Sequence, residues 1–249
     1  MKSTIVTLKN RTYADKPNED NYFCDDANGL YIIMDGVTRD RENGKYPVPS
    51  PAAIVTKIFI ESAYKFYVAN KSLYPIEVIL SGMMAFGNSK IAEFNSKKQW
   101  DNDFFPGTVG IILAFCNPLK IMYAYIGDCY GAVINQKIIP FTRCQTEKIA
   151  KHKKNYSSIE IRNEICNNIL HPYSYGVLNG SIKALSFVEY GEKVLLKNDK
   201  VILCTDGFSD IFTKLDIHAL NTLYPSQLEK YSKSPDDKTL IMISGDNND

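Results

Sequence analysis

The sequence predicts an α+β fold in which most strands pair antiparallel, within a single domain. Strand-like apolar runs come in clusters, and two helical segments separate the first cluster from the second. A doubly wound parallel sheet would instead alternate strands with helices along the whole chain. The 249 residues suffice for one large domain with a substantial core, and no repeat, low-complexity tract or linker divides them. We therefore expect one domain over residues 1–249.

The first half of the chain shows three short strand runs followed by two helices. Ser50 is a typical N-cap residue, and Pro51 suits the first turn of a helix. Apolar residues then recur at helical spacing as far as Phe66, which predicts an amphipathic helix. A second helix is predicted over residues 76–94, with Pro75 at its start. The strand runs are residues 4–7, 22–24 and 30–34.

The second half alternates short β-runs with polar segments. Three apolar runs lie between residues 107 and 133, and another strand is predicted at 137–141. We expect a flap segment at about residues 142–180, with a short helix at 158–168. Its lysine-rich stretch "KIAKHKK" (148–154) is typical of a solvated face, and the sharper alternative is a basic flap on the substrate side. Further strands are predicted at 184–188, 194–196, 201–204 and 239–244, with helical patches within 208–223 and 225–231.

Composition excludes several classes of partner. The 29 basic and 28 acidic residues leave a formal charge of +1, so no global field favours nucleic acid or an anionic membrane. The start lacks an apolar core long enough for a signal peptide, and no apolar stretch approaches the ~20 residues of a membrane span. The six cysteines form no Cys-x-x-Cys pair, so we expect reduced thiols rather than a zinc site. We expect a cytoplasmic monomer that binds neither nucleic acid nor membrane.

Apolar runs that end in an aspartate beside a glycine carry the functional argument. They read "YIIMDGV" (31–37), "MYAYIGDC" (122–129) and "CTDGFSD" (204–210). A single Asp-Gly pair is a common turn, but three such strand ends indicate one shared site. Carboxylates cannot gather without cations, because like charges raise one another's pKa, and Mg²⁺ or Mn²⁺ prefers oxygen ligands. The acidic residues that end or border strands are Asp20, Asp35, Asp128, Asp206, Asp210 and Asp236.

The alternative nucleophile schemes find little support in the sequence. None of the three histidines, at positions 152, 171 and 218, accompanies a Gly-x-Ser-x-Gly elbow, and no nucleotide-binding P-loop is present. Two metal ions ~3.5–4 Å apart could instead bridge a water, lower its pKa and direct it at a phosphoryl group. The glycine after Asp35 permits close approach of the backbone, so that its own carbonyl can serve as a ligand.

These motifs together resemble the metal-dependent serine/threonine phosphatases of the PP2C (PPM) family, in particular its compact bacterial members. The matching stretches are "NED" (18–20), "MDG" (34–36), "GT" (107–108), "IGD" (126–128), "CTDGFSD" (204–210) and "DDKT" (236–239). The resemblance implies a β-sandwich of two antiparallel sheets flanked by paired α-helices. It also implies hydrolysis of phosphoserine and phosphothreonine on proteins by a hydroxide that bridges two Mn²⁺ or Mg²⁺ ions, with a third ion in many members.

The resemblance assigns roles residue by residue. Asp20 matches the residue that holds metal-bound water beside the phosphate, with Glu19 as its acidic neighbour. Asp128 and Asp210 match the ligands of the third ion. Asp236 is preferred to Asp237 because the ligand usually comes first in this motif. The direct metal ligands are then Asp35, the Gly36 carbonyl, Asp206 and Asp236, and the residues expected to hold the nucleophilic water are Asp20, Asp35 and Asp206.

Two departures from the family pattern bear on substrate binding. Asp15 stands where the family often has a phosphate-binding arginine, so we expect the neighbouring Lys16 to contact the phosphate, with Arg11 and Arg39 as alternatives. Val37 follows the Asp-Gly pair and cannot protonate a leaving group. Two other functions stay open: a phosphatase for a small phosphorylated molecule, and a phosphatase-like binding module with little turnover. The complete set of metal positions favours an enzyme.

Overall fold

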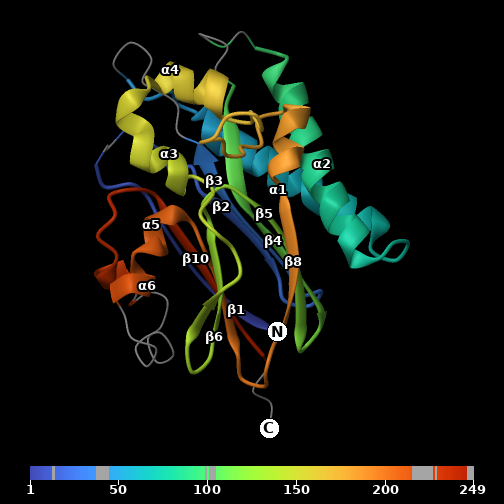
Figure 1. The fold of residues 1–249 in the computed structure, drawn as a ribbon. Coiled ribbons are helices and arrows are strands. Elements are labelled where there is room, and N and C mark those ends of the chain that lie inside the picture. Colours follow the sequence, from blue (N-terminus) through green and yellow to red (C-terminus); the bar gives the residue numbers. More distant parts are fainter. Residues whose placement is uncertain are drawn as a thin grey trace.

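A computed structural model describes residues 1–12, 15–37, 45–98, 100, 105–214, 227 and 229–245. Within these residues, two antiparallel sheets of five strands each pack face to face (Figure 1). The first sheet has the order β1 (Lys2–Leu8), β10 (Lys238–Ser244), β9 (Lys200–Cys204), β6 (Tyr130–Ile134) and β7 (Ile138–Pro140). The second has the order β2 (Asn21–Asp25), β3 (Leu30–Val37), β4 (Gly107–Asn117), β5 (Lys120–Ile126) and β8 (Glu189–Val194).

Strand β3 is buried on both of its faces, which explains its unbroken apolar run. Tyr31 and Ile33 pack between the sheets, against residues such as Leu203 and Ile241 of the first sheet. The alternate residues of β3, among them Ile32, pack toward the helices on the outer face. A strand covered on both sides loses the alternation of apolar and polar residues that marks a half-exposed strand. The core therefore has one layer between the sheets and another beneath the helices.

Two long helices cover the outer face of the second sheet (Figure 1). They are α1 (Pro51–Asn70) and α2 (Ile76–Asn95). The Ser50 side chain accepts a hydrogen bond from the backbone N–H of Ala53 at 3.3 Å, so the predicted N-cap is confirmed. On the first sheet, the short helices α5 (Asp206–Ser209) and α6 (Ile211–Lys214) pack through Phe208 and Ile211. In the described part of the chain, no helix is long and apolar enough to cross a membrane.

The polar segment between β7 and β8 contains more helix than predicted. Helix α3 (Glu147–His152) continues into the 3₁₀ turn η2 (Lys153–Asn155), and α4 (Ser158–Glu160) continues into η3 (Ile161–Ile165). The strand predicted at 184–188 is wrong. Residues Ile182–Phe187 form the 3₁₀ helix η4, because the Ser181 side chain caps the N–H of Lys183. The strand predicted at 194–196 also fails, because β8 ends at Val194.

Several sequence predictions fall outside the described residues. These are Arg39, His218 and most of the helical patches expected within 208–223 and 225–231. In the second patch the structure describes the 3₁₀ turn η5 (Glu229–Tyr231) and residue 227.

Candidate active site

One end of the sandwich holds a cavity of about 340 Å³ lined by four of the predicted aspartate ligands and by Gly36. Each aspartate comes from a different strand end. Asp35 lies near the end of β3, and Asp128 lies in the turn between β5 and β6. Asp206 opens α5 directly after β9, and Asp236 lies just before β10. Two sheets packed face to face thus bring residues that are 200 positions apart in the sequence to one cavity.

The glycines of the two Asp-Gly pairs are required by close packing. Neither has the positive φ that distinguishes a glycine turn. A Cβ on Gly36 would lie 2.8 Å from the Glu19 carbonyl oxygen. A Cβ on Gly207 would lie 1.9 Å from the carbonyl oxygen of Asp237. The two pairs therefore fit the backbone of neighbouring segments tightly around the site, which a side chain would prevent.

Asp20 has a carboxylate with one satisfied oxygen. Thr205 donates a hydrogen bond from its hydroxyl to Asp20 Oδ2 at 2.8 Å. The other oxygen, Oδ1, is buried and has no hydrogen-bond partner among the described residues. Burial raises the pKa of Asp20 to about 8, against the hydrogen bonds from Thr205 and Thr239 that lower it. A buried, half-satisfied carboxylate needs either a proton or a cation.

The buried carboxylates that line the cavity, Asp35, Asp128 and Asp206, share this requirement. Burial raises the pKa of Asp35 well above its usual range, and the nearby charges of Asp20 and Asp206 raise it further. Burial and the charge of Asp128 raise the pKa of Asp206 to about 7. The pKa of Asp128 is also raised, chiefly by burial, although Thr146 donates a hydrogen bond to its Oδ2 at 2.9 Å. In the absence of cations, Asp20, Asp35 and Asp206 therefore bind protons more tightly than exposed aspartates do.

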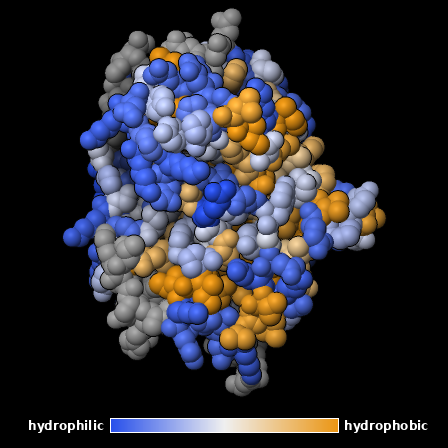
Figure 2. Space-filling model, viewed as in Figure 1, coloured by the Kyte–Doolittle hydropathy of each residue, from blue (hydrophilic) through white to orange (hydrophobic). Residues whose placement is uncertain are grey.

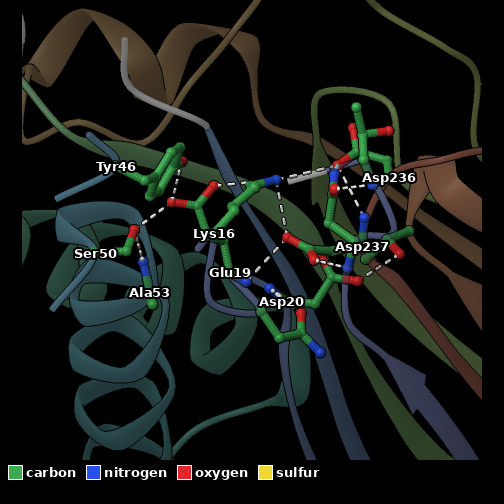
Figure 3. A network of polar contacts seen from close by, with 12 residues as sticks. Lys16, Glu19, Asp20, Tyr46, Ser50, Ala53, Asp236 and Asp237 are labelled. Atoms are coloured by element: carbon green, nitrogen blue, oxygen red, sulfur yellow. Dashed lines mark hydrogen bonds and ion pairs between the residues drawn. The ribbon is translucent and has the colours of Figure 1, made fainter. Parts of the chain in front are cut away.

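Asp236 and Asp237 have separate environments (Figure 3). The side chain of Asp236 is 47% exposed and lines the cavity. Asp237 is buried, and its carboxylate accepts hydrogen bonds from the backbone N–H groups of Asn10 at 2.6 Å and Glu19 at 3.1 Å. Asp237 thus holds the backbone beneath the site, while Asp236 is placed where the preferred ligand was expected.

Lys16 lies in a buried ion cluster and not on the cavity (Figure 3). Its side chain is 4% exposed, and its ammonium lies 2.9 Å from Asp237, 3.1 Å from Asp236 and 3.3 Å from Glu19. The three carboxylates more than offset the burial, so the pKa of Lys16 is raised. This position does not support the predicted contact between Lys16 and a substrate phosphate. Its ammonium already neutralises the acids of the site.

Glu19 connects this cluster to helix α1 (Figure 3). Its Oε1 accepts hydrogen bonds from the Tyr46 hydroxyl at 2.7 Å and from Ser50 Oγ. Ser50 therefore caps the helix and also binds Glu19. Sequence reasoning found the cap but missed the link to Glu19, because a lone tyrosine and a capping serine carry no signal for a distant acid.

Asp210 is one of two predicted ligands that the structure does not place on the cavity wall, the other being Asp20. Asp210 follows α5, and its Oδ2 accepts a hydrogen bond from the backbone N–H of Lys233 at 2.9 Å. Asp20 also stands behind the lining residues, although its charge reaches Asp35 and Asp206. The shared third ion of Asp128 and Asp210 stays a prediction.

The donor set fits a hard divalent cation. In the part of the chain that the structure describes, no three acidic, histidine or cysteine side chains already stand in an arrangement that could hold a metal ion. Desolvation and mutual repulsion oppose a closer approach of the carboxylates until positive charge arrives. The cavity nevertheless offers four carboxylates without histidine or cysteine, and the buried Asp20 Oδ1 lacks a partner among the described residues. Such all-oxygen sites suit Mg²⁺ or Mn²⁺.

The architecture is that of the PP2C (PPM) type of metal-dependent phosphatase. The serine/threonine phosphatase PstP/Ppp of Mycobacterium tuberculosis aligns with a TM-score of 0.70 at 17% identity, over 97% of each chain. The catalytic domain of the serine/threonine protein phosphatase PstP, in complex with two manganese ions, aligns with a TM-score of 0.65 at 17% identity, over 97% of this chain and 96% of that one. The PPM Ser-Thr phosphatase MsPP of Mycobacterium smegmatis, in complex with cacodylate, gives 0.67 at 12% identity, over 98% and 97%.

No protein-family model and no curated protein matches the sequence of this chain. Similarity to solved structures at such low identity establishes the fold. The predicted α+β sandwich of two antiparallel sheets, similar to PP2C phosphatases, is confirmed.

Proposed function

We propose that this protein is a metal-dependent phosphatase that hydrolyses phosphoserine and phosphothreonine on proteins. The observation that carries the proposal is the convergence of Asp35, Asp128, Asp206 and Asp236 on one cavity at the end of a PP2C-type sandwich. The manganese ions of the similar PstP catalytic domain support the choice of cation. Phosphoprotein substrates are inferred from the serine/threonine phosphatases that share the fold.

The ligands follow from the positions of the side chains. Asp35, Asp206, Asp236 and the carbonyl of Gly36 would hold two Mn²⁺ or Mg²⁺ ions, and Asp20 would orient water beside them. Ions held by these residues would supply a hydroxide nucleophile near neutral pH for in-line attack on phosphorus. Asp128 and Asp210 would hold a third, weaker ion.

The rest of the cavity positions the substrate. Its apolar wall includes Val37, Val109 and Ile149, which limit the access of water around the phosphoryl group. Val37 has no proton to donate, so the leaving serine or threonine oxygen takes its proton from water. No side chain serves as a covalent nucleophile in this proposal.

A metal-dependence assay tests the proposal. The purified protein should release phosphate from a phosphothreonine peptide in Mn²⁺ or Mg²⁺, and EDTA should abolish the release. Full activity in the chelator would contradict the metal mechanism. Comparison of the peptide with small phosphoesters separates a protein phosphatase from a small-molecule phosphatase. Absence of turnover on every phosphoester, p-nitrophenyl phosphate included, would favour the binding module.

A further inference from the structure

The acidic cavity contains one basic side chain among the described residues that line it, and this is Lys153. Lys153 is exposed, and no described residue forms an ion pair or side-chain hydrogen bond with its ammonium. It therefore differs from Lys16, whose ammonium is buried among three carboxylates. An exposed ammonium on the wall of an acidic cavity is available to an anion that enters it.

The end of helix α3 directs Lys153 toward the cavity. Ile149 and Ala150, four and three residues earlier, line the same cavity, so the three residues share one helix face. Ile149 is buried and fixes this face against the site. In Figure 1, α3 lies beside the end of β3 that carries Asp35.

The other basic residues of the run "KIAKHKK" have different surroundings. Lys151 forms an ion pair with Glu147 at 2.6 Å. The ring of His152 stacks on Tyr173 with 4.0 Å between the centroids. Lys148 borders a separate hollow, and Lys154 is exposed and does not line the acidic cavity. The surface over α3 is hydrophilic in Figure 2. Most of the basic residues in this run thus form a solvated face, and Lys153 is the one among them that lines the acidic cavity.

We propose that the Lys153 ammonium binds the phosphoryl group of the substrate, in the role that the sequence suggested for Lys16. This inference rests on the proposed phosphatase function. A phosphate monoester is a dianion near neutral pH, and a lysine can approach it as a point charge with three N–H donors. Lys153 is a substrate-binding residue in this proposal, and the carboxylates keep their place around the cations.

Kinetics of three variants test the proposal. Lys153→Met removes the charge and keeps an unbranched apolar side chain, Lys153→Arg keeps the charge, and Lys154→Met is the matched control from the same turn. In Lys153→Met, both KM for phosphothreonine peptide and Ki for inorganic phosphate should rise about tenfold, as expected for the loss of one charge-assisted hydrogen bond. The kcat and the Mn²⁺ stoichiometry should be retained. Lys153→Arg and Lys154→Met should stay close to wild type. Raising the salt concentration should reduce the difference in KM between Lys153→Met and wild type, because salt screens the attraction between the ammonium and the phosphate.

The outcomes separate this proposal from the proposed function. If the wild-type protein shows no metal-dependent turnover, the proposed function fails, and calorimetric titration with inorganic phosphate in Mn²⁺ then tests Lys153 directly. A roughly tenfold weaker affinity in Lys153→Met supports phosphate binding by this residue. Equal affinity in Lys153→Met and wild type, or no phosphate binding by either, overturns it. In an active enzyme, an unchanged KM, or an equal rise in Lys154→Met, overturns it as well.

Discussion

Asp206 and Asp210 are only four positions apart in one short motif, but the structure gives them different surroundings. Asp206 lines the cavity at the end of β9, whereas Asp210 lies behind it and accepts a hydrogen bond from the N–H of Lys233. We expect Asp206→Asn to lower kcat by about 10³-fold or more, because it removes a ligand of the proposed main ions. Asp210→Asn should reduce turnover much less and leave two ions bound. Steady-state kinetics and calorimetric metal stoichiometry check both expectations. Loss of the first two ions in Asp210→Asn would refute the assignment.

Burial gives Lys16 a structural role in place of the substrate contact that the sequence predicted. The carboxylates of Glu19, Asp236 and Asp237 surround its ammonium, so its removal leaves buried charges without compensation. We expect Lys16→Met to lower the free energy of unfolding by about 3 kcal/mol, the usual cost of breaking a buried ion pair from one side. Urea denaturation measures this. The control is Lys57→Met, which removes an exposed partner of Glu61 at 3.9 Å and should change stability little. An equally small effect for Lys16→Met would contradict the described cluster.

At the scale of elements, the contact between α5 and the loop before β10 depends on Gly207. An added Cβ would meet the Asp237 carbonyl oxygen at 1.9 Å, and backbone cannot give way cheaply. We expect Gly207→Ala to destabilise the protein by about 1–3 kcal/mol, the usual cost of forced overpacking, and to weaken metal binding because Asp206 must shift. Thermal unfolding and Mn²⁺ titration measure the two effects. Gly245→Ala is the control, since nothing lies within 4 Å of its added Cβ. Equal behaviour of the two variants would argue against this packing.

The elements that could be predicted are those whose signal is local. Ser50 and Pro51 placed the start of α1, and unbroken apolar runs placed β3, β9 and β10. The strand expected at 184–188 failed because a short apolar run fits a strand or a helix equally well, and the cap from Ser181 decided for a 3₁₀ helix. Helix α3 was missed because most of its residues are polar, so its few apolar residues do not form a recognisable helical pattern.

In the candidate site too, only features with a local sequence signal could be predicted. Strand ends that carry an aspartate beside a glycine predicted a shared site for Asp35, Asp128 and Asp206, and the structure places all three on one cavity. No sequence pattern revealed that Lys16 would be buried, and the alternative of a basic flap on the substrate side did not single out Lys153 among the residues of 148–154. Both facts depend on packing between segments far apart in the chain, and local patterns in a single sequence do not predict such contacts.

For the whole molecule, the crowded acids couple folding to pH and to metal. The pKa values of Asp20 and Asp206 rise from 3.8 to about 8 and about 7, so the folded protein binds protons that the unfolded chain has released. Their stabilising contribution is complete below about pH 4 and is lost as pH rises through 7 and 8. In EDTA, we expect Tm to fall between pH 5 and pH 8.

Added Mn²⁺ should offset this fall, and more so at the higher pH, because the metal binds the deprotonated acids. Differential scanning calorimetry at several pH values, with and without the metal, measures the effect. Asp206→Asn should show a shallower pH dependence in EDTA than wild type. A Tm in EDTA that does not change over this range would contradict the described burial of the acids.

Strand β10 lies between β1 and β9, and it pairs with β1 from Lys2 to Leu8. Strand β1 therefore pairs with residues 230 to 242 positions later in the sequence, and contacts of such long sequence separation form slowly. Until β10 is inserted, β1 and β9 expose unpaired edges that can recruit other chains. Asp236 reaches its place in the same step, since it lies two residues before β10. A chain in which β10 has not yet docked has neither the complete first sheet nor the complete acid cluster, so a single folding step both covers the strand edges and assembles the proposed site.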